Sequence, residues 1–215
     1  MTFPPVSVSA RSTYRHGDLR RVLLEAGIEL ARSGGPDAVV LREATRRAGV
    51  APNAAYRHFA SREALLQAVR AAALAAVAGA MEAELASLPA DLPPAELARA
   101  SVRAVGTGYL RFAQAETGLF RTAFARSEVL MQATPEAPTA GPGGLNPFEL
   151  LGAALDRLVT AGVMPPERRP GAEYLAWSAV HGLAMLVVDG PLAPVIGPQM
   201  AQIGQRLIDM VEKGL

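Results

Sequence analysis

Apolar residues recur in this chain at helical rather than strand spacing, and no other feature of the sequence constrains the fold as strongly. One set near the N-terminus follows intervals of four, three and four residues: Leu19, Leu23, Ala26 and Leu30. This spacing places the set on one face of an α-helix. Apolar and polar residues alternate only in a short stretch at residues 6–10. The sequence therefore predicts an all-α fold.

Gly and Pro residues divide the chain into about nine predicted helices. These cover residues 17–33, 41–48, 52–59, 61–87, 95–115, 119–124, 148–162, 170–188 and 196–213. The Pro/Gly-rich segment 134–147 predicts an irregular, mobile loop. We expect a flexible N-terminal arm (1–13), a three-helix helix-turn-helix domain (14–60) and a helical C-terminal domain (61–215) that begins with a connecting helix (61–87).

The charge distribution separates the two halves of the chain. Residues 1–70 hold eleven Arg, no Lys and six acidic residues, a net charge of +5, whereas the remaining residues hold ten basic and fourteen acidic side chains, a net charge of −4. A basic N-terminal part joined to an acidic body is typical of a nucleic-acid-binding domain fused to another domain.

Several classes of function find no support in the residues. The chain has no cysteine, its three histidines are far apart at positions 16, 58 and 181, and its one lysine is Lys213. No glycine-rich phosphate loop follows a strand. We therefore expect no enzyme, no metal and no cofactor. The start of the chain lacks a signal-peptide pattern and the longest apolar run, Ala71–Met81, is short, so we expect a soluble, cytoplasmic protein.

Two short predicted helices meet at Ala48-Gly49-Val50, where glycine permits the positive φ of a tight turn. This arrangement predicts a helix-turn-helix whose second helix can enter the major groove of DNA. Helical spacing turns Ala55 and Phe59 of that helix toward the core and leaves the intervening polar residues on its other faces.

The segment LREATRRAGVAPNAAYRHFASREALLQAV (41–69) resembles the DNA-binding signature of TetR-family repressors, and the likeness covers about residues 14–70. Further along, WSAVHGL (177–183) resembles the Trp-x-x-x-His-Gly signature of one C-terminal subtype of that family. The resemblance implies a homodimer that binds double-stranded DNA at a palindromic operator, most often as a repressor released by a small molecule. A ligand-independent regulator or an activator of the same fold is the alternative.

The resemblance also assigns DNA contacts. It implies that bases are faced by Arg42, Pro52, Asn53 and Ala54, and that phosphates are held by Tyr56, His58 and Arg62. The family's hydroxyl residues at the start of each motif helix are replaced by Val40 and Ala51, so each helix lacks a side-chain cap. The N-terminal arginines can compensate in DNA binding: Arg11, Arg15 and Arg20.

In the C-terminal domain, aromatic residues are either core or the lining of a ligand pocket. The candidates for the pocket are Tyr109, Phe112, Phe124, Phe148, Trp177 and His181, with His181 either a polar anchor or a hydrogen-bonded core residue. The lining predicts an uncharged or weakly polar organic effector, and loop 134–147 is its expected entrance. The resemblance implies pairing of the last two helices with a second copy, with the interface candidates Leu183, Met200, Ile203 and Leu207.

Overall fold

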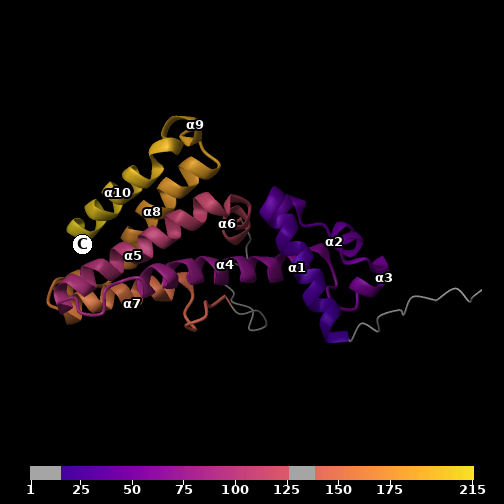
Figure 1. Ribbon diagram of the computed structural model, residues 1–215, viewed down its shortest axis with the longest axis horizontal. Coiled ribbons are helices and arrows are strands. Elements are labelled where there is room, and N and C mark those ends of the chain that lie inside the picture. The colour runs from indigo at the N-terminus through magenta and orange to yellow at the C-terminus, as the bar shows by residue number, and fades with distance from the viewer. Residues whose placement is uncertain (1–15, 126–138) are drawn as a thin grey trace, which may run out of the picture.

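The computed structural model describes residues 16–125 and 139–215, and within these ranges the regular secondary structure is helical, with no strand (Figure 1). The all-α prediction is confirmed. The α-helices are α1 His16–Gly34, α2 Leu41–Ala48, α3 Pro52–Ala55, α4 Arg62–Ala86, α5 Pro94–Ala115, α6 Thr117–Ala123, α7 Pro147–Thr160, α8 Ala172–Val188, α9 Ala193–Ile196 and α10 Met200–Gly214.

Helices α1, α2 and α3 gather at one end of the molecule, and α4 runs lengthwise from them into the rest of the chain (Figure 1). Their shared core contains side chains that are almost wholly buried: Leu23, Leu30, Ala55, Phe59 and Leu65. The apolar stripe expected on the first helix supplies the first two of these. Because Leu65 belongs to α4, the connecting helix is part of the core of this small domain.

The second helix of the motif is shorter than the predicted 52–59. It ends at Ala55, whose carbonyl oxygen accepts from the amides of both His58 (2.9 Å) and Phe59 (2.9 Å). This turn directs Phe59 into the core and leaves Ser61 extended. The Ser61 hydroxyl then accepts from the Ala64 amide at 3.2 Å, so α4 begins with a side-chain cap at the residue that the sequence predicts.

Helix α4 packs unusually closely against α5. A Cβ at Gly108 of α5 would lie 2.6 Å from the carbonyl oxygen of Ala80 in α4, so only glycine permits this approach. Among the described residues α4 is also the one unbroken helix long and apolar enough to cross a membrane, with a mean hydropathy of 1.6. Half of that window is buried within the protein, which is typical of a core helix.

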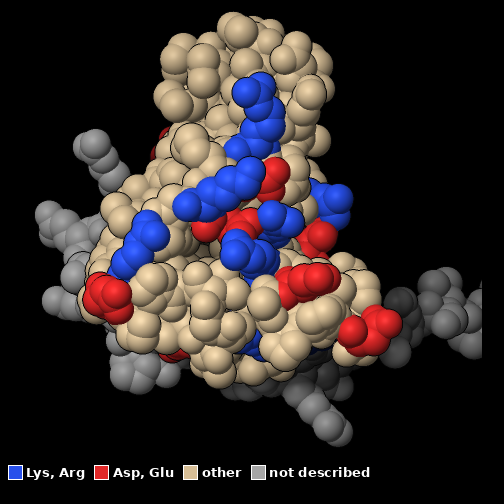
Figure 2. All heavy atoms as spheres, turned by 90° about the vertical axis from the view of Figure 1, so that its left-hand side faces the viewer, with Lys and Arg blue, Asp and Glu red and all other residues tan. Residues whose placement is uncertain are grey.

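A buried carboxylate ties α10 to α5. The side chain of Glu212 is 1% exposed and accepts from Arg99 and from Arg103, the latter at 2.5 Å. Burial disfavours the carboxylate, but these hydrogen bonds outweigh it and lower the pKa of Glu212. Basic and acidic side chains intermingle on this end of the molecule (Figure 2). The basic side chains here are thus partly neutralised by acidic neighbours.

The end of the chain differs from the predicted single helix 196–213. Pro194, Gly197 and Pro198 divide it into α9, a 3₁₀ turn (Gly197–Gln199) and α10, because proline lacks the amide that a continuous helix requires. Helices α8 and α10 nevertheless lie side by side, as Figure 1 shows.

Candidate nucleic-acid interface and ligand cavity

The turn between α2 and α3 has the geometry that the sequence predicts. Gly49 adopts φ 67° and ψ 29°, the left-handed region. Its amide donates to the Arg46 carbonyl oxygen (3.3 Å), and the Val50 amide donates to that of Thr45 (3.1 Å). These bonds satisfy the last carbonyls of α2 and fix the direction in which α3 leaves.

The side chains assigned to DNA contact lie on the solvent side of this motif. Arg42 of α2 and Pro52 and Asn53 of α3 are exposed, Tyr56 is 57% exposed, and Ala54 and His58 are half-buried. As the spacing predicts, Ala55 and Phe59 face the core. The two helices occupy the outer end of the domain (Figure 1). The exposed face thus presents an amide, a guanidinium, a phenol and an imidazole to a ligand outside the protein.

Neither motif helix has a side-chain cap. Val40 and Ala51 are extended residues that precede α2 and α3, and no side-chain hydrogen bond caps either helix. Arg20 lies in α1 rather than in the arm, and its guanidinium stacks over the Phe59 ring at 4.9 Å. Arg11 and Arg15 lie outside the described residues.

The two arginines that end α2 are held by an acidic residue of the same helix. Arg46 donates to the Glu43 carboxylate at 2.6 and 2.8 Å, and Arg47 does so at 3.4 Å. The hydrogen bonds from Arg46 lower the pKa of Glu43 to about 2. Glu43 therefore stays ionised and offsets part of the positive charge of α2.

Arg62 has a structural function that the sequence does not reveal. Its Nε donates to the carbonyl oxygen of Val39 (2.8 Å), and its Nη2 donates to that of Pro36 (2.9 Å). The guanidinium therefore joins the first turn of α4 to the backbone that precedes α2. This geometry competes with the phosphate contact assigned to Arg62.

Replacing Arg62 with Ala is expected to lower the free energy of unfolding by about 1–3 kcal/mol, because two carbonyl oxygens lose a charged donor. Urea unfolding of the purified protein measures this. Arg57→Ala is the control, since Arg57 is exposed on the same motif and its loss should change stability by less than about 0.5 kcal/mol. An unchanged unfolding midpoint for Arg62→Ala, together with weaker binding to every duplex, would instead support the phosphate contact.

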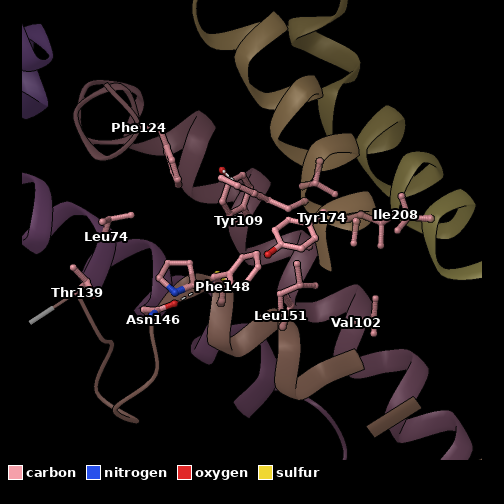
Figure 3. Close-up of a pocket in the computed structure, with 18 of the residues that line it drawn as sticks. Leu74, Val102, Tyr109, Phe124, Thr139, Asn146, Phe148, Leu151, Tyr174 and Ile208 are labelled. Carbon is pink, nitrogen blue, oxygen red and sulfur yellow. Dashed lines mark hydrogen bonds between the residues drawn. The ribbon is translucent and has the colours of Figure 1, made fainter. Parts of the chain in front are cut away.

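The C-terminal domain contains a cavity of about 620 Å³ between α4, α5, α7, α8 and α10. In Figure 3, Leu74 and Thr139 lie at one end of the lining, and Val102 and Ile208 lie at the other. Phe148, Tyr174 and Trp177 line it while remaining 39%, 61% and 37% exposed. The cavity therefore reaches solvent between α7 and α8.

Four of the six pocket candidates line this cavity: Tyr109, Phe124, Phe148 and Trp177. The other two do not. Phe112 is 8% exposed and packs in the core. His181 lies behind the lining, where its Nδ1 is 2.7 Å from the Tyr109 hydroxyl.

Burial disfavours charge on both members of the Tyr109–His181 pair. Burial lowers the pKa of His181 and raises that of Tyr109. The Tyr109 hydroxyl and His181 Nδ1 share one hydrogen bond, and the tautomer of the imidazole decides which of the two atoms donates. His181 thus positions a lining residue through one hydrogen bond.

The described part of the expected entrance loop is held by several hydrogen bonds. In residues 139–146 the Gly141 amide donates to the Leu145 carbonyl oxygen (2.9 Å), and the Gly143 amide donates to Glu82 of α4 (3.0 Å). Asn146 then caps α7 through the amides of Phe148 and Glu149. Thr139 and Asn146 of this stretch line the cavity, and the stretch has no regular secondary structure, as the sequence predicts; residues 134–138 lie outside the described part.

Sequence reasoning missed Arg70 of α4, which lines the cavity and is only 5% exposed. Its Nε is buried without a hydrogen-bond partner, and burial lowers the pKa of its guanidinium. The available signal was a lone charge in the otherwise apolar stretch from Ala68 to Met81.

Helix α6 connects the cavity wall to the small domain. A Cβ at Gly118 of α6 would lie 2.3 Å from the carbonyl oxygens of Ala31 and Arg32 in α1. Beside it, Arg32 donates to Glu116 at 2.8 Å. Phe120 of the same helix packs edge-on against Tyr109, with ring centroids 5.3 Å apart. A displaced Tyr109 would therefore press on a helix that is in backbone contact with α1.

The outer faces of α8 and α10 expose large apolar side chains. Of the four interface candidates, Leu183, Ile203 and Leu207 are half-buried, but Met200 is 1% exposed. Met200 therefore belongs to the protomer's own core, although helical spacing places it on nearly the same side of α10 as Ile203 and Leu207. The remaining exposed residues of these faces are Leu175, Leu186 and Met210.

Two family models match the chain: "Bacterial regulatory proteins, tetR family" over residues 23–69, and "Tetracyclin repressor-like, C-terminal domain" over residues 102–211. A comparison with curated proteins gave no match.

Several solved structures share the fold. A protein of unknown function from Rhodococcus sp. RHA1 is 25% identical, with a TM-score of 0.68 over 95% of this chain and 99% of its own. FadR from Bacillus subtilis in complex with stearoyl-CoA is 12% identical, with a TM-score of 0.64 over 91% and 98%. A TetR variant from Acinetobacter baumannii AYE in complex with minocycline is 17% identical, with a TM-score of 0.58 over 91% and 91%. Since the C-terminal model alone covers about half of the chain, the chain belongs to the TetR family of bacterial regulatory proteins, which are DNA-binding regulators and not enzymes.

Proposed function

We propose that the protein is a transcriptional repressor that binds a near-palindromic operator as a homodimer and is released by a small organic effector. The observation that carries this proposal is one rigid helix, α4, that belongs to both functional parts. Its first turn is bonded to the backbone before α2 through Arg62, and residues from Arg70 to Met81 line the cavity. We further propose a cytoplasmic location and the Trp-x-x-x-His-Gly subtype for the C-terminal domain.

In this proposal the exposed face of α2 and α3 reads the major groove. Asn53 is exposed near the N-terminus of α3, where an amide can bond adenine at two positions, and Arg42 can bond guanine in the same way. Pro52 and Ala54 are suited to apolar contact with thymine methyl groups. Tyr56 and His58 stand beside them and would bind phosphates, which sets register rather than sequence preference.

Replacing Asn53 with Ala is expected to weaken operator binding by about 1–3 kcal/mol, roughly 5- to 150-fold, and to relax the preference at one base pair of each half-site. Selection of binding sites from random duplexes, followed by fluorescence anisotropy, measures both effects. Arg111→Ala is the control, because Arg111 is an exposed residue of α5 paired with Glu84. An unchanged consensus for Asn53→Ala would show that this amide reads no base.

Dimerisation would bury the apolar outer faces of α8 and α10. Leu175, Leu183 and Leu186 follow helical spacing on α8, and Ile203, Leu207 and Met210 do so on α10. A contiguous exposed apolar surface of this kind is typical of a protein interface. A two-fold axis through this surface would place the two helix-turn-helix motifs at one side of the dimer, as a palindromic site requires.

Effector release would act through the two contacts that join the domains. A ligand that binds the cavity more tightly in a splayed dimer shifts the population toward that form. The change in the C-terminal domain is transmitted to the helix-turn-helix motifs through α4 and through α6, which contacts α1 at Gly118. Because half-site spacing is fixed by DNA geometry, a shift of a few ångströms would remove several contacts together. The stearoyl-CoA and minocycline in the complexes of the two similar proteins lend support to an organic effector.

A further inference from the structure

The cavity has one charged group in an otherwise apolar or neutral lining. Among the lining residues that the structure describes, Arg70 is the only one that carries a charge. It is 95% buried, since only 5% of its surface is exposed, and its Nε has no hydrogen-bond partner. It lies in α4 and is one of the residues that line the cavity.

A buried guanidinium whose Nε has no hydrogen-bond partner is costly, because the protein interior replaces water poorly around an ion. The cost falls when an anion enters beside it. Arginine has a planar fork of N–H donors that matches the two oxygens of a carboxylate or a phosphate. A negatively charged group beside Arg70 would therefore be favoured over a neutral one.

Arg70 lies toward one end of the cavity, whose lining is otherwise mostly apolar. Leu74, one helical turn after Arg70, lies with Thr139 at one end of the lining, and Val102 and Ile208 lie at the other (Figure 3). Between them the surface is formed by aromatic rings, among them Tyr109 and Phe148. A ligand that fills this volume therefore needs an elongated apolar body with its charge at one end.

We propose that the effector is an amphipathic organic anion, with a carboxylate or phosphate paired to Arg70 and an apolar chain or ring system that extends toward Ile208. This inference rests on the proposed effector function and replaces the uncharged molecule that the aromatic lining suggested. It also places the charge two turns from Arg62 on the same helix, about 12 Å at the helical rise per residue. The anion therefore binds α4 near the point where that helix holds the DNA-binding domain.

The test compares matched anionic and neutral probes on the full-length protein. Dodecanoate is compared with 1-dodecanol, and 4-phenylbutyrate with 4-phenyl-1-butanol, by calorimetry below the micellar concentration; dodecyl phosphate distinguishes phosphate from carboxylate recognition. At least one acid should bind about 10- to 100-fold more tightly than its alcohol, the difference that a charge-assisted hydrogen bond contributes. Operator release is measured in parallel by anisotropy.

Arg70→Met removes the charge with little loss of volume, and it should abolish the preference for the acid while retaining alcohol binding. The same variant without ligand should melt no lower than the wild type, because it removes a buried ion whose Nε has no hydrogen-bond partner. Arg70→Lys keeps a charge and should retain part of the preference, and Arg111→Met should retain all of it.

Equal affinities for acids and alcohols, or no binding of any acid, would overturn the inference. If alcohols release the operator as well as acids do, the effector function survives and only the charge assignment fails. If Arg70→Met melts well below the wild type, the guanidinium has a structural partner instead.

Discussion

Replacing Leu207 with Asp is expected to convert the protein to a monomer and to weaken operator binding by at least about 100-fold. Leu207 is half-buried on the outer face of α10, so a single protomer can solvate the new carboxylate. In a dimer that buries this face, the same carboxylate would be desolvated without a partner, at a cost of several kcal/mol. A monomer reads only one half-site and therefore loses about half of the binding free energy.

Sedimentation velocity at micromolar concentration gives the oligomeric state, and anisotropy with an operator duplex gives the affinity. Leu183→Asp should reproduce both effects from α8. Gln114→Asp is the matched control, since Gln114 is exposed on α5 away from these faces, and it should remain dimeric. A wild-type protein that sediments as a monomer would refute the proposed interface directly.

Phe120→Ala is expected to lower the free energy of unfolding by about 3–5 kcal/mol, the loss typical of a large aromatic side chain truncated in a well-packed core. Phe120 is fully buried, and its ring packs against Tyr109 at 5.3 Å and Phe124 at 4.9 Å. Truncation leaves a void between α6 and α5 that the neighbouring helices cannot fill, because Gly118 holds α6 against the backbone of α1.

Denaturant unfolding measures this loss, and Phe124→Ala provides a matched comparison. Phe124 is half-buried and lines the existing cavity, so its truncation enlarges a space already present and should cost less than that of Phe120. A loss below about 1 kcal/mol for Phe120→Ala would mean that α6 moves freely to close the void, and α6 would then be a poor link between the cavity and α1.

The parts of the molecule that follow from local chemistry were predicted from the sequence. The turn at Gly49 needs a left-handed residue, and the cap at Ser61 needs a hydroxyl one turn before the amide it accepts from. Both features lie within a few residues of the groups they serve. For the same reason the buried positions of Ala55 and Phe59, and the absence of caps at Val40 and Ala51, are confirmed.

Only the tertiary structure decided which apolar and charged residues lie in the core, on the outer faces or around the cavity. Met200 and Leu207 share one amphipathic helix, but periodicity does not tell whether a face meets the protomer's own core or a second surface. Arg62 and Arg70 both belong to α4, yet one holds carbonyl oxygens of the backbone before α2 and the other lines a cavity closed by α7 and α10. The sequence determined the helices and the motif, because their causes are local. The partners of each side chain depend on helices that meet only after the chain has folded.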